Sequence, residues 1–256
     1  SFSPRTGGAP ANVCAAFARL GGASSFLTQL GDDPFGHKIA RELEACGIDL
    51  SHLVFTDKAN TALAFVSLEE DGNRTFSFYR KPSADLLYAP EQIDLAWFRD
   101  AFALHFCSVS LVDSPMRHAH LAAIGAAREA GAIVSFDPNL RPQLWKSLDE
   151  AKVEIEYGLS KCDILKISDN EIQWLTGKND YTEAVKWIRE KYDIPLILVS
   201  MGKEGSRAYY QDRMVEKAPF INENTIETTG AGDTFCACVL HYICKHGLEN
   251  LTEKNL

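Results

Sequence analysis

The chain has 256 residues, of which 46% are hydrophobic, so it can bury a sizeable core and is most simply one domain. Acidic residues exceed basic ones by 35 to 26, giving a formal charge of −9 with no cluster of Lys and Arg along the chain. This balance disfavours nucleic acid and anionic membranes as partners. No apolar run approaches the roughly 20 residues that a membrane span needs.

The seven cysteines are odd in number, scattered among apolar residues and free of any C-x-x-C pair. This usage is typical of reduced thiols in a cytoplasmic protein. Cys236 and Cys238 are two positions apart on an expected helix, so they point to different sides and make a poor metal pair.

The first expected element is a helix that follows the glycine-bearing stretch 7–12, Gly-Gly-Ala-Pro-Ala-Asn. Apolar residues then recur with helical period through residue 20, and again from 35 to 43 after Pro34. The stretch 7–12 is a candidate ligand site, and an ordinary helix start with Pro near its first position is the alternative.

Short apolar runs rich in β-formers alternate with these helical segments and suit a buried parallel sheet covered on both faces. The expected strands are residues 25–30, 102–108, 132–137, 163–167 and 195–200. The sequence therefore predicts an α/β protein with a mostly parallel central sheet.

One region departs from this alternation. Residues 60–80 alternate apolar and polar, turn at 69–73 and alternate again, which predicts an antiparallel hairpin. A hairpin that is apolar on one side only has to lie against a ligand, the main domain or a second subunit. A purely structural, peripheral hairpin is the alternative.

A loop at 136–142, Phe-Asp-Pro-Asn-Leu-Arg-Pro, follows an expected strand and brings an acid, an amide and a guanidinium together. In an open α/β sheet such a loop faces the ligand crevice at the carboxyl ends of the strands. A Pro-stiffened loop with a local Asp/Arg pair is the alternative.

The stretch 226–235, Ile-Glu-Thr-Thr-Gly-Ala-Gly-Asp-Thr-Phe, opens an apolar helical run. It is neither a P-loop nor a dinucleotide fingerprint, because no Gly-Lys-Ser/Thr ends it and Phe235 replaces the third glycine. Its glycines let the backbone approach a ligand, and the helix amides that follow bind anions such as phosphate. Asp233 lies in the first turn, where capping of those free amides is the alternative to catalysis.

These segments together resemble the PfkB (ribokinase-like) carbohydrate kinase family, most closely its fructokinases. The resemblance rests on GGAPANVCAAFARLGG at 7–22 and TTGAGDTF at 228–235, two signature regions more than 200 residues apart. QLGDDPFG at 29–36, FDPNLRPQLW at 136–145, CDILKISDNEIQWLTG at 162–177 and LVSMGKEG at 198–205 also look like the family. The loop 136–145 and the Lys-Ile-Ser at 166–168 favour the fructokinase branch.

The resemblance implies a three-layer α/β/α ribokinase-like domain over residues 1–256, with a β-hairpin lid inserted at 60–88. It implies an ATP- and Mg²⁺-dependent sugar kinase in which fructose is the best single acceptor. 2-Keto-3-deoxygluconate or a nucleoside is an alternative acceptor within the family. A non-catalytic sensor of sugar or nucleotide on the same fold is an alternative of another class.

Roles at the reacting centre follow from the same resemblance. Asp233 would be the general base that takes the proton of the sugar hydroxyl, and Gly230, Ala231 and Gly232 would contribute to the anion hole with the Asp233 amide. Gly8 and Asn12 would hydrogen-bond sugar hydroxyls.

The outer contacts also follow from the resemblance. The lid would close over the sugar through Phe78 or Tyr79 and Arg80, and Arg141 would steady the phosphates. Further residues match the nucleotide and metal positions of the family: Ser168, Ser200, Gly202 and Gly205 for the nucleotide, and Glu171 for Mg²⁺ through water. An acid that favours the start of its own helix is the alternative for Glu171.

The sequence departs from the family at four places. Glu227 stands where most members have Asp, which puts activation by a monovalent cation in doubt. Ser168 replaces the Asn of the family's Asn-x-x-Glu motif. The usual first strand and the final helical region are not found in the chain, so we expect the natural protein to extend beyond both ends. A homodimer formed through the lid is also expected.

Overall fold

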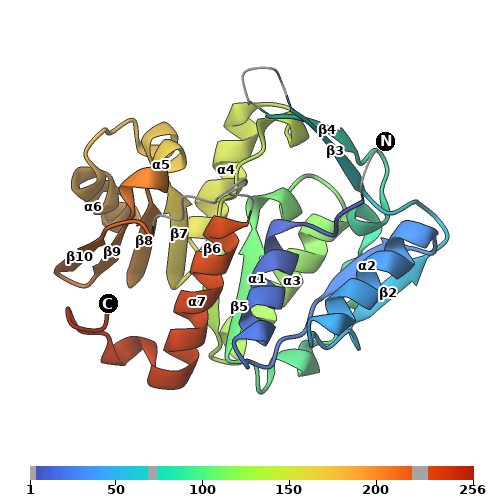
Figure 1. The fold of residues 1–256 in the computed structure, drawn as a ribbon, viewed down its shortest axis with the longest axis horizontal. Helices are drawn as coiled ribbons and strands as arrows, with labels where there is room; N and C mark the ends of the chain where they lie inside the picture. The colour runs from blue at the N-terminus through green and yellow to red at the C-terminus, as the bar shows by residue number, and fades with distance from the viewer. Residues whose placement is uncertain (1–3, 69–73, 221–229) are drawn as a thin grey trace.

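The computed structural model describes residues 4–68, 74–220 and 230–256 (Figure 1). The strands are β1 (Thr28–Gly31), β2 (Leu53–Thr56), β3 (Leu63–Leu68), β4 (Arg74–Tyr79), β5 (Ala103–Cys107), β6 (Ile133–Asp137), β7 (Ile164–Ser168), β8 (Leu196–Ser200), β9 (Ser206–Tyr210) and β10 (Arg213–Lys217). The helices are α1 (Ala9–Arg19), α2 (Pro34–Ala45), α3 (Pro115–Glu129), α4 (Leu148–Leu159), α5 (Asp169–Thr176), α6 (Tyr181–Lys191) and α7 (Ala231–His246). Within the described ranges, no helix has the length and apolar character needed to cross a membrane.

Six strands form the central sheet in the order β10-β9-β8-β7-β6-β5. The strands from β5 to β8 run parallel, whereas β9 and β10 join antiparallel at one end. Residues 196–199 of β8 are all buried, since helices cover both faces of the sheet. This continuous burial explains why the parallel strands have apolar sequences without alternation, and it confirms the predicted mostly parallel sheet.

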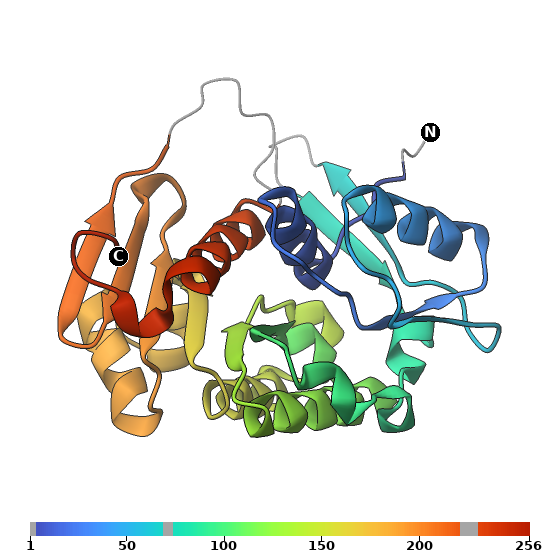
Figure 2. The ribbon, with the colours of Figure 1, turned by 90° about the horizontal axis from the view of Figure 1, so that it is seen from below.

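Helices lie on both faces of the sheet and give three layers (Figure 2). Successive residues of a strand point to opposite faces, so Ile164 belongs to a hydrophobic cluster with residues of α1 and α7, while Leu165 belongs to another with residues of α3, α4, α5 and α6. Both side chains are fully buried. The predicted α/β/α arrangement is confirmed.

A second sheet consists of β1 and β2, which pair in parallel. The helix α2 follows β1 directly, with Asp33 as its N-cap: the Asp33 carboxylate accepts from the Phe35 amide at 2.9 Å and from the Gly36 amide at 2.8 Å. Among the described strands, β1 pairs only with β2 and β5 only with β6. Each of the two sheets therefore ends in an unpaired strand edge.

The hairpin formed by β3 and β4 projects from the body of the molecule (Figure 1), and its turn at 69–73 lies outside the described residues. Its register places Ala64 opposite Phe78, so these two share a face. Phe65 lies on the other face with Tyr79, their ring centroids 5.2 Å apart. The expectation that the hairpin is apolar on one side only is wrong, because this register puts aromatic residues on both faces, Phe65 and Tyr79 on one and Phe78 on the other.

Candidate active site

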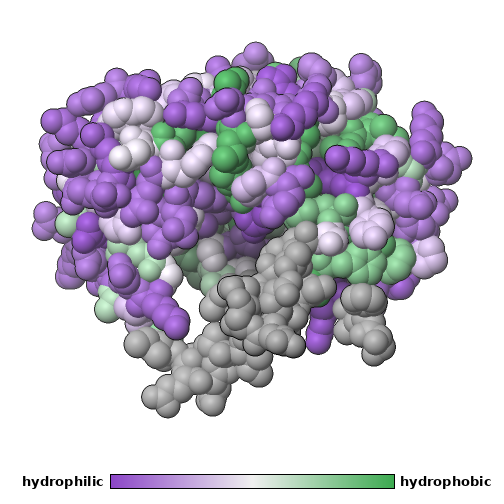
Figure 3. All heavy atoms as spheres, turned by 90° about the horizontal axis from the view of Figure 1, so that it is seen from above, coloured by the Kyte–Doolittle hydropathy of each residue, from purple (hydrophilic) through white to green (hydrophobic). Residues whose placement is uncertain are grey.

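Two helix starts converge at the centre of the molecule. Gly8 precedes α1 with φ +125°, and Gly230 precedes α7 with φ +80°, a left-handed conformation that favours glycine. The two turns are close enough that a Cβ on Gly230 would lie 3.5 Å from Nδ2 of Asn12. Seen from the end of the sheet that carries the hairpin, hydrophilic side chains surround a hollow in this region (Figure 3).

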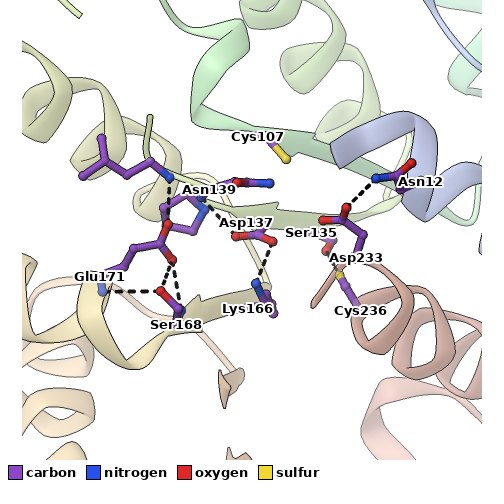
Figure 4. Close-up of polar contacts among 12 residues, drawn as sticks. Asn12, Cys107, Ser135, Asp137, Asn139, Lys166, Ser168, Glu171, Asp233 and Cys236 are labelled. Carbon is purple, nitrogen blue, oxygen red and sulfur yellow. Dashed lines mark hydrogen bonds and ion pairs between the residues drawn. The ribbon is translucent and has the colours of Figure 1, made fainter. Parts of the chain in front are cut away.

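The Asp233 side chain is buried beside these turns, with 7% of its surface exposed. Its Oδ2 accepts a hydrogen bond of 2.8 Å from Nδ2 of Asn12 on α1 (Figure 4). The N-cap of α7 is Gly230, and no side chain caps this helix start. Asp233 is therefore oriented by a neighbouring helix and does not cap its own.

The first amides of α7 form an anion-binding geometry. The first backbone hydrogen bond of the helix runs from the Thr234 amide to the Gly230 carbonyl at 2.9 Å. The amides of Ala231, Gly232 and Asp233 come before it and have no carbonyl four residues earlier in the helix to bond. Such a helix start carries partial positive charge and favours a phosphate.

A buried ion pair lies next to this helix start, where β6 and β7 end (Figure 4). Nζ of Lys166 is 3.0 Å from Oδ2 of Asp137, and the Asp137 side chain has no exposed surface. Burial raises the pKa of Asp137 to about 6, although the attraction of Lys166 opposes this rise. Burial lowers the pKa of Lys166, but attraction to Asp137, the hydrogen bond to it and smaller contributions from Glu171 and Cys236 together outweigh burial, so the pKa lies above the ordinary value and the ammonium stays charged.

A polar group lies under the ion pair on the same face of the sheet. Nδ1 of His105 is 3.0 Å from Oγ of Ser135, and Sγ of Cys236 is 3.9 Å from the same hydroxyl. Burial, with a smaller contribution from Lys166, lowers the pKa of His105 to about 4, and burial raises the pKa of Cys236 to about 12. At neutral pH the imidazole is uncharged and the thiol protonated, so neither group is an activated nucleophile.

Glu171 joins the loop after β6 to the start of α5. Its Oε2 accepts from the amide and the hydroxyl of Ser168 at 3.0 and 2.8 Å, which completes a capping box. Its Oε1 accepts from the Leu140 amide at 2.7 Å and keeps one lone pair. In the structure, Glu171 therefore caps the start of its own helix, as the structural alternative expects. One lone pair of its Oε1 is still able to accept a hydrogen bond.

The predicted nucleotide residues lie along the ends of β7, β8 and β9. Ser168 and Ser200 are partners in the register of β7 and β8. Gly202 has φ +54° in the following turn and Gly205 has φ +98°. A Cβ on Gly205 would lie 2.0 Å from the Lys217 carbonyl oxygen, so the turn requires glycine there.

Three residues predicted to contact the sugar or the phosphates are not hydrogen-bonded to Asp233 in the described part of the structure. Arg80 donates from Nε to Asp85 at 2.8 Å and from Nη1 and Nη2 to the Val109 carbonyl at 3.3 Å, which ties the base of the hairpin to the body. The Tyr79 residue is 66% exposed. Arg141 is exposed and donates to the Leu140 carbonyl at 3.0 Å. The hydrogen bonds of the described residues connect none of the three to Asp233.

Sequence reasoning missed Lys166 as a site residue, although a signal was present. A lysine lies in the otherwise apolar strand Ile164-Leu165-Lys166-Ile167, and charged side chains are rarely buried without a partner. Glu227, which the sequence singles out for its departure from the family, lies outside the described residues.

The chain is similar to known proteins in sequence and in fold. The model of the pfkB family carbohydrate kinases matches residues 1–250. Fructokinase-2 of Solanum lycopersicum is 43% identical over 239 residues, which cover 93% of this chain and 73% of that protein.

Two solved structures are also similar. Fructokinase from Xylella fastidiosa with bound ATP is 36% identical with a TM-score of 0.86, covering 93% of this chain and 74% of the other. Fructokinase from Vibrio cholerae in its fructose-, ADP- and calcium-bound form is 36% identical with a TM-score of 0.85. The match covers 93% of this chain and 76% of the other.

Proposed function

Because the chain belongs to the pfkB family of carbohydrate kinases, we propose that it is an ATP-dependent fructokinase, which transfers the γ-phosphoryl group of ATP to the 6-hydroxyl of D-fructose. The observation that carries this proposal is the buried Asp233 carboxylate, held by Asn12 beside the first amides of α7. The fructokinases from Xylella fastidiosa and Vibrio cholerae, solved with ATP and with fructose and ADP, support the choice of substrates.

In the proposed reaction Asp233 acts as the general base. As the 6-hydroxyl oxygen forms its bond to the γ-phosphorus, the bond from that phosphorus to the bridging oxygen of ADP breaks, and the hydroxyl proton passes to Asp233. The amides of Ala231, Gly232 and Asp233 stabilise the negative charge on the transferring group without having to reorganise. A positioned base adds typically about 10²–10⁴-fold to the rate.

Gly8 and Asn12 are the proposed contacts to the sugar, because their turn adjoins the base. Asn12 donates to Asp233 through Nδ2, and its side-chain oxygen is left to accept from a hydroxyl. Tyr79 and Arg80 are proposed to reach the sugar only when the hairpin moves, since Arg80 holds Asp85 in this structure. Arg141 is the proposed outer contact to the phosphates.

The nucleotide is proposed to lie over the ends of β7 and β8, next to Ser168 and Ser200, with Gly202 and Gly205 shaping the turn beside it. Mg²⁺ would supply charge neutralisation of the ATP phosphates when bound. In the described part of the chain, no three His, Cys, Asp or Glu side chains gather closely enough to hold a metal ion by themselves. This fits an ion held mainly by phosphates and water, with Glu171 accepting from one of those waters through its remaining lone pair.

The oligomeric state and compartment belong to the same proposal. The hairpin is the proposed dimer contact, because Val66 is 47% exposed on one face and Tyr79 is 66% exposed on the other. We place the protein in the cytoplasm, in agreement with its seven free cysteines. Activation by a monovalent cation is not proposed.

The deciding experiment incubates the protein with ATP, Mg²⁺ and a panel of fructose, 2-keto-3-deoxygluconate and nucleosides, and measures ADP. ADP formation that depends on fructose is expected, and preference for another acceptor would move the protein to another branch of the family. Sugar binding by calorimetry without ADP formation would indicate a sensor.

The variant Asp233→Asn keeps the shape of the side chain and removes the base. Its kcat should fall about 10²–10⁴-fold while ATP still binds. Asp149→Asn is a matched control, because Asp149 is an exposed acid in the first turn of α4 and should leave kcat unchanged. An unchanged kcat in Asp233→Asn would remove Asp233 from its proposed role.

A further inference from the structure

Lys166 is an unusual residue for its position. Its neighbours Ile164, Leu165 and Ile167 on β7 are fully buried, and Lys166 itself is only 7% exposed. A buried ion pair is seldom the most stabilising choice for a core, since apolar residues of similar volume often do as well or better. The pair with Asp137 therefore calls for a reason other than packing.

The position of the ammonium group supplies that reason. A Cβ added to Gly232 would lie 2.9 Å from Nζ and 3.3 Å from Cε of Lys166, so the end of the lysine rests against the first turn of α7. The start of a helix carries partial positive charge, and an ammonium group against it is repelled. This arrangement becomes favourable when an anion lies between the helix amides and the lysine.

Two further carboxylates lie near the ion pair, since Glu171 acts on the charge of Lys166 and Asp233 on that of Asp137, but the ammonium group is bonded to Asp137. Asp137 forms the ion pair, Asp233 is bonded by Asn12, and Glu171 is occupied by Ser168 and Leu140. An ammonium group has three donors, and one of those of Lys166 points to Asp137.

We propose that Lys166 is a catalytic residue that donates to the transferring phosphoryl group, and that Asp137 is a positioning residue that fixes the direction of its ammonium group. This inference rests on the proposed function, since it assigns a cation to the same reaction. It also explains why position 232 is glycine: a larger residue would push the ammonium group away from the phosphoryl group.

The first test is Lys166→Met, which keeps the length of the side chain and removes the charge. Loss of one positioned donor to the transition state should lower kcat by about 10²–10³-fold. The Kd of ADP, measured by calorimetry, should change by less than about threefold because ADP lacks the transferred group. A kcat within about threefold of the wild type in the folded variant would overturn the proposal.

Lys166→Met leaves Asp137 without its partner, so the single variant could fail to fold. Lys166→Met combined with Asp137→Asn removes both charges and leaves no unpaired buried ion. We expect this double variant to be folded by circular dichroism and still slow. Recovery of wild-type turnover in it would show that the pair is only structural and would overturn the proposal.

Gly232→Ala tests the contact itself. Alone, it should lower kcat, because its Cβ would displace the ammonium group. In the Lys166→Met background the same substitution should have almost no further effect, since the group it displaces is gone. Equal effects of Gly232→Ala in both backgrounds would contradict the proposal.

Wild-type protein that phosphorylates no acceptor would contradict the proposed function, whereas active wild type with active Lys166→Met contradicts only this inference.

Discussion

At the scale of single residues, the hydrogen bond from Asn12 fixes the orientation of the Asp233 carboxylate. A hydrogen bond to a charged group contributes about 1.5–3 kcal/mol. Asn12→Ala should therefore lower kcat/KM for the sugar by about 10- to 100-fold, measured by ADP release. Asn170→Ala is the control, because Asn170 is an exposed amide at the start of α5 and should behave as wild type. An Asn12→Ala enzyme with wild-type kcat/KM would show that the bond has no catalytic role.

A second prediction at this scale concerns His105 and pH. Burial lowers its pKa to about 4 in the folded protein, below the ordinary 6.5, so folding favours the neutral ring. Its contribution to stability is fully present above pH 6.5 and is lost as the pH falls toward 4, a change of about 3 kcal/mol in the free energy of unfolding.

Urea unfolding of wild type and His105→Asn at several pH values measures this contribution. The difference in the free energy of unfolding between the two proteins should shrink as the pH falls through that range. A difference that stays constant between pH 6.5 and 4 would contradict the assignment. Asp137 titrates in the same pH range, because its pKa is raised to about 6, and its titration stabilises the protein as the pH falls. Both proteins contain Asp137, so its contribution cancels in the difference between them.

At the scale of elements, glycines decide where strands and turns can lie. Gly205→Ala would place a Cβ 2.0 Å from the Lys217 carbonyl oxygen at a residue with φ +98°. We expect the turn between β8 and β9 to open, at a cost of about 2–4 kcal/mol in the free energy of unfolding. Gly125→Ala is the control: Gly125 is exposed inside α3 with nothing within 4 Å of the added Cβ. It should stabilise the protein by about 0.5–1 kcal/mol.

At the scale of the whole molecule, the proposed dimer makes a prediction for mass in solution. Light scattering should give twice the mass of the chain, and Val66→Lys should shift it toward the monomer, because it places a charge on the 47%-exposed face of the hairpin. Val153→Lys alters a 64%-exposed valine on α4 and should leave the dimer intact. A monomeric wild type, or a dimer that Val66→Lys does not affect, would contradict the proposed contact.

The sequence predicts the parallel strands well, because burial on both faces requires unbroken apolar runs such as residues 196–199. It does not reveal β9 and β10, whose segments Ser206–Tyr210 and Arg213–Lys217 mix charged and apolar residues at the edge of the sheet. The sequence also does not reveal which side chains of β3 and β4 share a face, because that depends on the pairing register between the strands and not on the pattern within one strand.

Some features of the candidate site are also visible in the sequence, whereas others depend on contacts between separate elements. Glycine-rich helix starts are visible as local patterns, and the resemblance to the family singled out Asp233 and Asn12 at two of them, whose roles stay predictions. The contacts of Arg80 with Asp85 and Val109 and the position of Lys166 against Gly232 come from separate elements, and no spacing in the sequence encodes them.

The bond between Asn12 and Asp233 joins residues 221 positions apart. During synthesis α1 emerges from the ribosome before β5 to β10, and Asp233, the proposed base that α1 orients, emerges after them. Contacts of such long sequence separation form late, because closing the long loop is costly in entropy. A nascent chain therefore lacks the proposed base until α7 has folded against α1, and we expect no phosphoryl transfer before that contact forms.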